Sequence, residues 1–427
     1  MSTIRGTLSE LSRAADAFAH EVDEAGYGDY TFLPDNSPFD LSFLTSKGLE
    51  ARGSLIAAAE KILRLAKGPQ GCLASFADTK GIEMGTIQAL TQLEVPDKVP
   101  LQGSITYEEL AGVIRVAPEL LQRLVRLAAL AGFLIEDESG AVRHTAMSAV
   151  FLRDTAAGDT ARFLFDVDMR AYSFFADSLR LDPSGQNIGD GPTALAFQHD
   201  SDDQGNRPTI WDILERNPIQ RARFHSTMQA LGSFPSHLLK HILVAHDWHS
   251  IGSLVDVGGS LGHASLVIAE NFPEIRITVQ DLPDVVERGR SSLPTVPHAE
   301  RVSFQAHDLF QEQAIIADAY FLRQILHDWP DGDAERIVRC LIPAMRPGAK
   351  LLIMDIVVPE PGAISPYMEK YLRTYDVSMF SMFSAKERTV QQLRDLVERC
   401  SARLQFQGIS CPPGSATSLL SWVYSAE

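Results

Sequence analysis

The chain has few cysteines, and none lies in a motif that would pair thiols or bind a metal ion. Cys72, Cys340, Cys400 and Cys411 form no Cys-x-x-Cys pair, and no histidine stands near them at a spacing suited to zinc. The other histidines are scattered along the chain. We therefore expect ordinary thiols in a reducing compartment and no metal site.

Long apolar runs and positive charge are also scarce. No stretch approaches the ~20 apolar residues that span a membrane, and the first residues mix charged and polar side chains, unlike a signal peptide. The 427 residues include 38 Lys+Arg against 55 Asp+Glu, which gives a net charge of −17. Such a charge repels the phosphates of nucleic acids and the headgroups of anionic lipids. We expect a cytoplasmic protein with neither nucleic acid nor membrane as a partner.

The length of the chain suggests two or more folding units. Residues 1–155 are rich in helical apolar spacing, and their second half is typical of helix, turn, helix and a short hairpin around Gly140. A winged helix has this pattern, and it either binds DNA or serves as a dimerisation module of the same shape. The predicted helix 118–131 offers only Arg123 and Arg126 as cations. The pattern therefore favours a dimerisation module.

Two further regions follow along the chain. Residues 156–235 predict linking helices that contribute to a substrate pocket, and residues 236–427 alternate β-like runs with helical runs. Such alternation is typical of a mostly parallel sheet with helices on both faces, which is an α/β fold. The β-like runs are SLVDV, IRITVQ, VSFQAH, AYFLR, KLLIMDIVV, LQFQGI and LLSWVY.

The first motif with chemical meaning is LVDVGGSLGHAS at residues 254–265. An apolar strand runs into Gly258 and Gly259, so backbone without side chains stands where a ligand can approach closely. The following residues break the Gly-x-Gly-x-x-Gly spacing of dinucleotide enzymes. Asp281 follows at the roughly 20-residue interval at which an acid holds ribose hydroxyls. A tight turn with an unrelated surface aspartate is the alternative interpretation.

Five segments in a fixed order extend this pattern: VDVGGSLGHAS, FPEIRITVQDLPDVV, VSFQAHDLF, FLRQILHDWPDGDA and SAKERT. Together they resemble the plant caffeate-type and fungal secondary-metabolite O-methyltransferases. In the amino-terminal region LEVPDKVP, ITYEELA and GAVRHTAMS are similar to the dimerisation domain of that family. The resemblance implies a seven-stranded Rossmann-like domain that binds S-adenosylmethionine, preceded by a helical, winged-helix dimerisation domain, in a homodimer.

The resemblance also assigns residues to the cofactor. It implies that the methionine portion of S-adenosylmethionine lies near the Gly258-Gly259 turn and that Asp281 binds the ribose. Arg323 stands where the family usually has lysine, and the two cations differ in shape. The residues implied for adenine are Leu282, Asp308 and Leu309.

His327 is the residue on which we expect the chemistry to depend. Methylation of a phenol at neutral pH requires removal of the hydroxyl proton, and the pKa of histidine suits that task. The motif HDWPD places His327 just after the fourth predicted strand, at the edge where open α/β sheets bind ligands. Taken alone, this histidine could equally cap a helix or fill the core. The resemblance implies that it is the general base, oriented by Asp355 and Glu387, although plant relatives usually have glutamate in place of Asp355.

The acceptor pocket is indicated by an aromatic and methionine-rich run. The resemblance places substrate contacts at Phe224, Met228, Met379 and Met382, whereas a helix core is an equally good interpretation of such a run. Asp328 could accept a hydrogen bond from a second hydroxyl of the acceptor, or it could cap a helix.

Three functions are open at this stage. The first is methyl transfer from S-adenosylmethionine to a hydroxyl of an aromatic or polyketide-type natural product. The second keeps the cofactor as a fixed positive charge and catalyses dehydration or pericyclic ring closure. The third is a regulatory winged-helix protein. The retained His327 favours the first.

Overall fold

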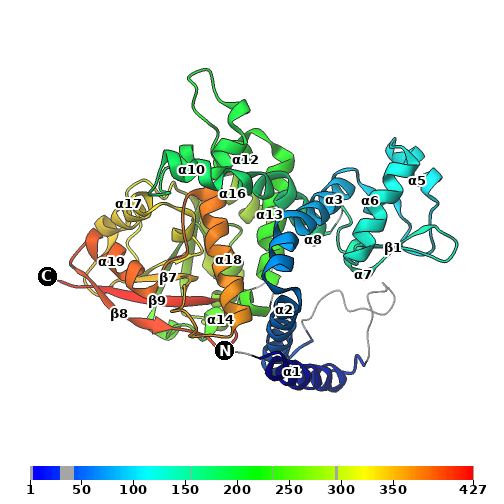
Figure 1. The fold of residues 1–427 in the computed structure, drawn as a ribbon. Coiled ribbons are helices and arrows are strands. Elements are labelled where there is room, and N and C mark those ends of the chain that lie inside the picture. The colour runs from blue at the N-terminus through cyan, green and yellow to red at the C-terminus, as the bar shows by residue number, and fades with distance from the viewer. Residues whose placement is uncertain (1–2, 29–42, 154, 234, 294–296, 427) are drawn as a thin grey trace. The chain divides into compact units, whose positions relative to one another are not determined.

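The computed structural model describes residues 3–28, 43–153, 155–233, 235–293 and 297–426. The chain forms two compact units, and each unit combines segments that are distant in sequence (Figure 1). The first unit comprises Met1–Met169, Leu214–Ala230 and Ser365–Met368, and the second comprises Arg170–Ile213, Leu231–Ile364 and Glu369–Glu427.

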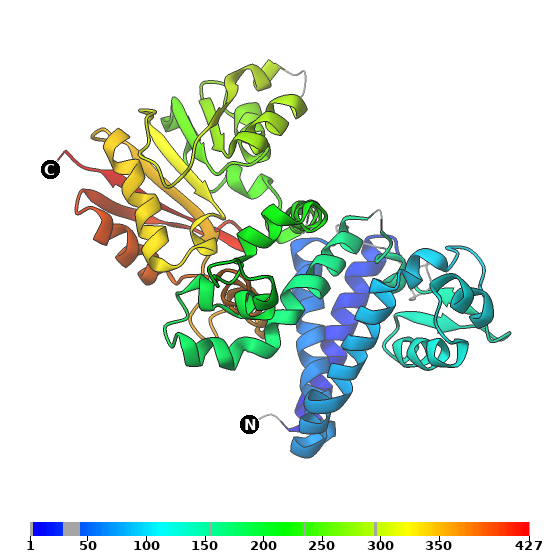
Figure 2. The ribbon, with the colours of Figure 1, turned by 90° about the horizontal axis from the view of Figure 1, so that it is seen from above.

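Long helices dominate the first unit. Helices α1 (Ile4–Glu24) and α2 (Ser46–Ala74) pack along each other, as Figure 2 shows. Helix α2 is kinked at Gly68, where the backbone has a φ of 64° and a proline follows. A short π-helical segment leads into α3 (Lys80–Gln92). The shorter helices of this unit are α4 (Val95–Lys98), α7 (Ala146–Ala149) and α8 (Ala156–Phe163).

The predicted helix, turn, helix and hairpin is confirmed. It consists of α5 (Tyr107–Ile114), α6 (Pro118–Leu130), β1 (Leu134–Glu136) and β2 (Val142–His144), and β1 pairs antiparallel with β2. A reciprocal pair of hydrogen bonds between Thr106 and Glu109 caps α5, which explains where that helix begins.

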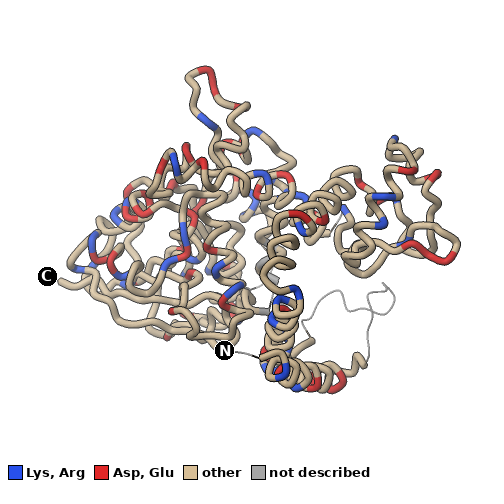
Figure 3. The backbone as a smooth tube through the Cα atoms, viewed as in Figure 1, with Lys and Arg blue, Asp and Glu red and all other residues tan. Residues whose placement is uncertain are grey.

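An ion pair joins the second helix of this module to its hairpin. Arg126 on α6 is occupied by a bidentate contact with Glu136, with N···O distances of 2.8 and 2.9 Å. Acidic side chains follow on the hairpin at residues 136–138, where Figure 3 shows the tube in red.

A seven-stranded sheet forms the centre of the second unit. Its strand order is β5-β4-β3-β6-β7-β9-β8, in which the neighbours from β5 to β7 are parallel and β9 is antiparallel to β7 and β8. This confirms the predicted α/β fold with a mostly parallel sheet. The strands are β3 (Ser253–Val257), β4 (Arg276–Asp281), β5 (Val302–Ala306), β6 (Ala319–Arg323), β7 (Lys350–Ile356), β8 (Leu404–Ser410) and β9 (Thr417–Tyr424).

Alternate strand residues point to opposite sides of the sheet. Both sets are apolar on β3, so both faces of the sheet are covered by helices. On β3, Leu254 belongs to the apolar cluster that contains Ile268 of α15 (His263–Asn271) and Val286 of α16 (Pro283–Ser292). The next residue, Val255, belongs to the cluster built on α17 (Asp331–Leu341) and α19 (Val390–Cys400). The shorter helices of this unit are α10 (Phe175–Leu181), α11 (Pro192–Ala196) and α14 (Lys240–Leu243).

Four helices of the described chain contain residues of both units: α9 (Met169–Ala171), α12 (Ile210–Arg216), α13 (Pro218–Ser233) and α18 (Pro366–Phe383). Over the part of the chain that the structure describes, no helix has both the length and the apolar character needed to cross a bilayer.

Candidate functional site

The turn after β3 begins with two glycines at positions that do not accommodate a side chain. Gly258 has a φ of 71°, in the left-handed region that favours glycine. A Cβ on Gly259 would lie 2.6 Å from the Asp256 carboxylate carbon and 2.8 Å from a methyl of Val279. The amides of both glycines donate to the carbonyl of Gln280, at 2.8 and 3.1 Å. The turn is therefore packed against the end of β4, and close packing within the fold is itself a reason for these glycines.

Asp281 ends β4 beside this turn. Its Oδ2 accepts a hydrogen bond from the amide of Ser260 at 2.9 Å, and its Oδ1 accepts one from the amide of Leu282 at 2.8 Å. Burial raises the pKa of Asp281, and these two amides oppose that shift. Each carboxylate oxygen keeps a further lone pair. The carboxylate is thus fixed in place and can still accept hydrogen bonds from two neighbouring hydroxyls.

The residues expected beside adenine gather at the carboxyl ends of β4 and β5. The amide of His307, which follows β5, donates to the carbonyl of Asp281 at 3.0 Å. Asp308 accepts a hydrogen bond from the amide of Phe310 at 2.9 Å and so shapes the loop that carries Leu309. Leu282 is more than half exposed, which leaves an apolar side chain open at this edge.

Arg323 ends β6, between two strands that each carry an aspartate as their penultimate residue. Asp256 lies on β3 and Asp355 lies on β7, and β6 runs between these strands. Burial lowers the pKa of Arg323, whereas the charges of the two carboxylates oppose that shift. Its Nε is buried without a hydrogen-bond partner. A guanidinium donor left unpaired at the ligand edge of the sheet is suited to an anionic group of a ligand.

His327 lies in the short 3₁₀ segment η9 (Leu326–Asp328), directly beyond β6, and is buried. Its Nδ1 lies 2.8 Å from Oε1 of Glu387, whose side chain is fully buried. Its Nε2 lies 3.5 Å from Oδ1 of Asp328, beyond ordinary hydrogen-bond range. Glu387 therefore fixes the ring through Nδ1, whereas the contact of Nε2 with Asp328 is longer.

The charges around His327 favour its protonated form. Burial lowers the pKa of His327, but Glu387, Asp328 and Asp355 together outweigh burial and raise it to about 10. Burial raises the pKa of Asp328 to about 6, although His327 opposes this. The carboxylates therefore favour the protonated imidazole, whereas burial opposes it.

The two acids expected to orient the histidine differ in their contacts. Glu387 forms the direct hydrogen bond, whereas Asp355 acts on His327 through its charge. Neither carboxylate oxygen of Asp355 has a hydrogen bond of ordinary geometry, although the Ile325 amide lies near enough to oppose the rise in its pKa that burial causes. The shorter aspartate side chain is consistent with this lack of direct contact.

The residues expected at the acceptor fall into two groups. Met379 and Met382 lie on α18 in the second unit and are buried there. Phe224 and Met228 lie on α13 in the first unit, where the Phe224 ring packs 5.5 Å from that of Phe163. Their proximity to His327 stays a prediction.

Comparison with known proteins agrees with this architecture. The model of the O-methyltransferase domain matches residues 197–401, and that of the O-methyltransferase dimerisation domain matches residues 82–154. The chain is 45% identical over 425 residues to a 6-hydroxytryprostatin B O-methyltransferase of Neosartorya fischeri, covering 99% of this chain and 100% of that protein. An Aspergillus fumigatus protein of the same name is 48% identical over 347 residues, which are 81% of this chain and 99% of that one.

The chain belongs to the O-methyltransferase family. The same fold also occurs in a solved structure described as a pericyclic reaction enzyme, with a TM-score of 0.69 and 21% identity, covering 98% of this chain and all of that one. At that identity the likeness concerns the fold alone. The relatives at 45–48% identity therefore favour methyl transfer over the alternative of a cofactor that keeps its methyl group.

As an O-methyltransferase, the protein uses S-adenosylmethionine, and the residues present fit that cofactor. Asp281 has free acceptor sites for the ribose hydroxyls, and Arg323 has a buried donor without a partner. Within the described ranges, no group of three or more His, Cys, Asp or Glu side chains is placed to hold a metal ion.

Sequence reasoning missed two side chains beside this O-methyltransferase site. His237 is buried, and burial together with the charges of Arg323, His241 and His327 lowers its pKa to about 4. Trp211 stacks on Trp329, two residues after His327, with ring centroids 5.5 Å apart and an interplanar angle of 20°. Both reach the site from distant parts of the chain, and no local motif marks them.

Proposed function

We propose that this O-methyltransferase methylates a hydroxyl group of an aromatic natural product, with His327 as the general base and Glu387 as the residue that orients it. The observation that carries the proposal is the 2.8 Å contact between Nδ1 of His327 and Oε1 of Glu387. It fixes the ring at the ligand edge of the sheet and leaves Nε2 to receive a proton.

The cofactor supplies an electrophilic methyl group and a positive charge. In our proposal Asp281 would hold the ribose through its carboxylate, and Arg323 would bind an anionic group of the methionine portion. Nε2 of His327 takes the hydroxyl proton of the acceptor, and Glu387 stabilises the resulting imidazolium through Nδ1. Asp328, beside Nε2, can accept a hydrogen bond from a second hydroxyl of the acceptor.

The raised pKa of His327 adds a condition to this mechanism. A general base must be neutral when it accepts a proton, yet the three carboxylates raise the pKa of the imidazole and favour its charged form. A positive charge placed near the ring lowers its pKa, because two like charges repel. In our proposal the positive charge of S-adenosylmethionine, when bound, would lower the pKa of His327 and favour its neutral form.

The acceptor that we propose to test first is 6-hydroxytryprostatin B, which is named for two relatives at 45% and 48% identity. A cluster of aromatic side chains that includes Trp329, two residues after His327, supports a flat, aromatic acceptor. Trp329 stacks on Trp211, which lies 5.2 Å from the Phe383 ring. Such rings bind planar molecules by stacking and by burying apolar area.

We further propose a homodimer formed through the helical unit. The dimerisation domain model covers residues 82–154, and large apolar side chains lie exposed nearby. Leu73 is 69% exposed and Phe76 is 67% exposed, which is unfavourable unless another surface covers them. Light scattering at micromolar concentration tests this, and a monomer would contradict it.

The proposed reaction is tested with S-adenosylmethionine labelled in its methyl group. The acceptors are 6-hydroxytryprostatin B and a panel of phenolic, polyketide and pyridone metabolites. Label in an acceptor product supports methyl transfer. An isomerised or dehydrated product without label would contradict it and favour the cofactor as a fixed charge.

A further inference from the structure

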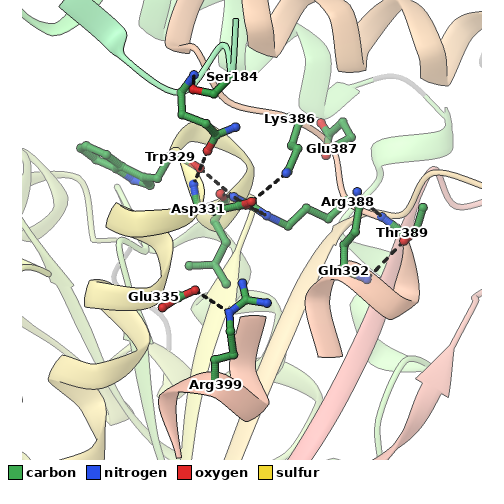
Figure 4. Close-up of polar contacts among 12 residues, drawn as sticks. Ser184, Trp329, Asp331, Glu335, Lys386, Glu387, Arg388, Thr389, Gln392 and Arg399 are labelled. Atoms are coloured by element: carbon green, nitrogen blue, oxygen red, sulfur yellow. Dashed lines mark hydrogen bonds and ion pairs between the residues drawn. The ribbon is translucent and has the colours of Figure 1, made fainter. Parts of the chain in front are cut away.

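Arg388 lies buried between the segment that carries the base and the segment that carries its carboxylate partner. Only 2% of its surface is exposed. Nη1 donates to the carbonyl of Leu326 at 2.6 Å, and Nη2 donates to the carbonyl of Trp329 at 2.8 Å. Nε and Nη2 also contact Oδ1 of Asp331, at 3.0 and 2.8 Å. Figure 4 shows the guanidinium reaching from its own segment to these groups.

These contacts of Arg388 lie on both sides of the base along the chain. Leu326 precedes His327, and Trp329 follows it by two residues, so the guanidinium holds the backbone on both sides of the base. Glu387 immediately precedes Arg388. One side chain thus fixes the loop that bears the imidazole relative to the backbone that bears the carboxylate, across a separation of 62 residues.

The Asp331 carboxylate completes this arrangement. Lys386 donates to Oδ2 of Asp331 at 2.7 Å, and the amide of Asp331 donates to Oε1 of Gln186 at 2.8 Å. Lys386 touches the aspartate but none of the carbonyls that flank the base, and its side chain is 30% exposed. Lys386 therefore differs from Arg388 in that it does not hold the backbone on either side of His327.

A lysine could not replace this guanidinium. Arginine presents several N–H donors in one rigid plane, whereas lysine is a point charge on a flexible chain. Two carbonyls and a carboxylate oxygen surround the guanidinium and accept from three of its nitrogens. An ammonium at this position keeps the charge, but it cannot make the whole set of contacts.

We propose that Arg388 is a positioning residue that sets the separation and relative orientation of His327 and Glu387. The inference rests on the proposed function, in which His327 is the base. Loss of the guanidinium lets residues 326–331 shift relative to Glu387, so the ring is no longer aligned for proton transfer while the cofactor residues on β4 and β6 keep their places. Misplacement by about 1 Å is enough to slow such a step roughly 100-fold.

The experiment compares Arg388→Lys with the control Lys386→Met, after thermal melts of both. Kinetics with labelled cofactor should give a kcat for Arg388→Lys that is roughly 10- to 100-fold lower at an unchanged cofactor KM. Lys386→Met should change kcat by less than roughly threefold, because it removes only a half-exposed ion pair. Equal kcat values for Arg388→Lys and the wild-type protein would overturn the proposal.

A second readout needs no acceptor. In protein labelled at its histidines, the His327 resonance is identified by its absence from a His327→Gln variant, and its titration is followed by NMR. Arg388→Lys should lower the apparent pKa of His327 by about one unit or more, because the ring moves away from Glu387. An unchanged titration would overturn the positioning role of Arg388 even if no acceptor is methylated. Failure of this role can therefore be distinguished from failure of the proposed methyl transfer.

Should Arg388→Lys not fold, Asp331→Asn provides the same test. It keeps the buried guanidinium but removes the charge that aligns it, and its carboxylate is 36% exposed. A smaller decrease in the pKa of His327 and in kcat, in the same direction, supports the proposal. No change in either quantity would contradict it.

Discussion

The glycine turn and the histidine loop lie at the same edge of one sheet, but they are held by different kinds of interaction. Around the turn, backbone amides donate hydrogen bonds to the carbonyl of Gln280 and to the carboxylate of Asp281. The bond from Ser260 to Asp281 spans 21 residues. Around the loop, buried charged side chains meet across about 60 residues, as in the pair His327 and Glu387. The cofactor side therefore depends on close packing, whereas the catalytic side depends on balanced charge.

This difference has a consequence for substitutions. A change in the turn alters sterics or a single hydrogen bond, so it should affect folding or cofactor affinity. A change in the loop alters charge and alignment, so it should affect turnover and the response to pH. Substitutions at the two regions should therefore separate effects on folding and cofactor affinity from effects on turnover and pH response.

The largest effect is expected for His327→Gln, which removes the base but keeps a polar side chain. Its kcat should fall roughly 10²–10⁴-fold, the usual contribution of a positioned proton acceptor. Cofactor affinity, measured by calorimetry, should stay close to that of the wild-type protein. A well-folded variant with nearly wild-type turnover would exclude His327 as the base.

Asp281→Ala should weaken cofactor binding by about 1–3 kcal/mol, because the ribose loses hydrogen bonds to a charged acceptor. The matched control is Asp284→Ala, at an exposed aspartate three residues further along. Calorimetry with S-adenosylmethionine checks both variants. Equal affinities in the two variants would remove the ribose assignment.

Gly259→Ala should cost about 1–3 kcal/mol of folding free energy, because its methyl would overlap Asp256 and Val279 in a packed turn. Gly332→Ala is the control, since a Cβ there would meet nothing within 4 Å. Urea unfolding measures both changes. A Gly259→Ala protein as stable as the control would show that close packing does not select this glycine.

The smallest effect concerns pH and His237. Its pKa is lowered to about 4 in the folded protein, against an ordinary value of 6.5. The unfolded chain therefore binds more protons between these values, so stability should fall as pH decreases from 6.5 towards 4. In His237→Gln this decrease should be smaller by about 1–2 kcal/mol, which is less than the roughly 3 kcal/mol that the full shift implies. Urea unfolding at several pH values checks it, and parallel pH curves for the two proteins would contradict it.

Much of the fold could be predicted because its signals are local. The seven β-like runs became the seven strands, and the helix predicted at 118–131 is Pro118–Leu130. Asp281 was found through its distance from the glycine turn. The boundaries near residues 155 and 235 stay predictions.

The histidine side could be predicted only in part. The family resemblance indicated His327 and Glu387, which the structure places 2.8 Å apart. The same resemblance indicated Asp355, which has no direct contact with the ring. His237 and Arg388 went unnoticed, because their roles depend on tertiary contacts between distant segments that neither spacing nor periodicity records.

The central claim is that His327 removes the hydroxyl proton of the acceptor, and its most direct test is the dependence of rate on acceptor acidity. Single-turnover rates are measured at neutral pH for wild-type protein and His327→Ala, with a series of acceptors that differ in hydroxyl pKa. For the variant the rate should fall by about tenfold for each unit of acceptor pKa, because only the ionised hydroxyl reacts, whereas the wild-type rate should depend on it much less steeply. Equally steep lines for both proteins would show that His327 takes no part in proton removal.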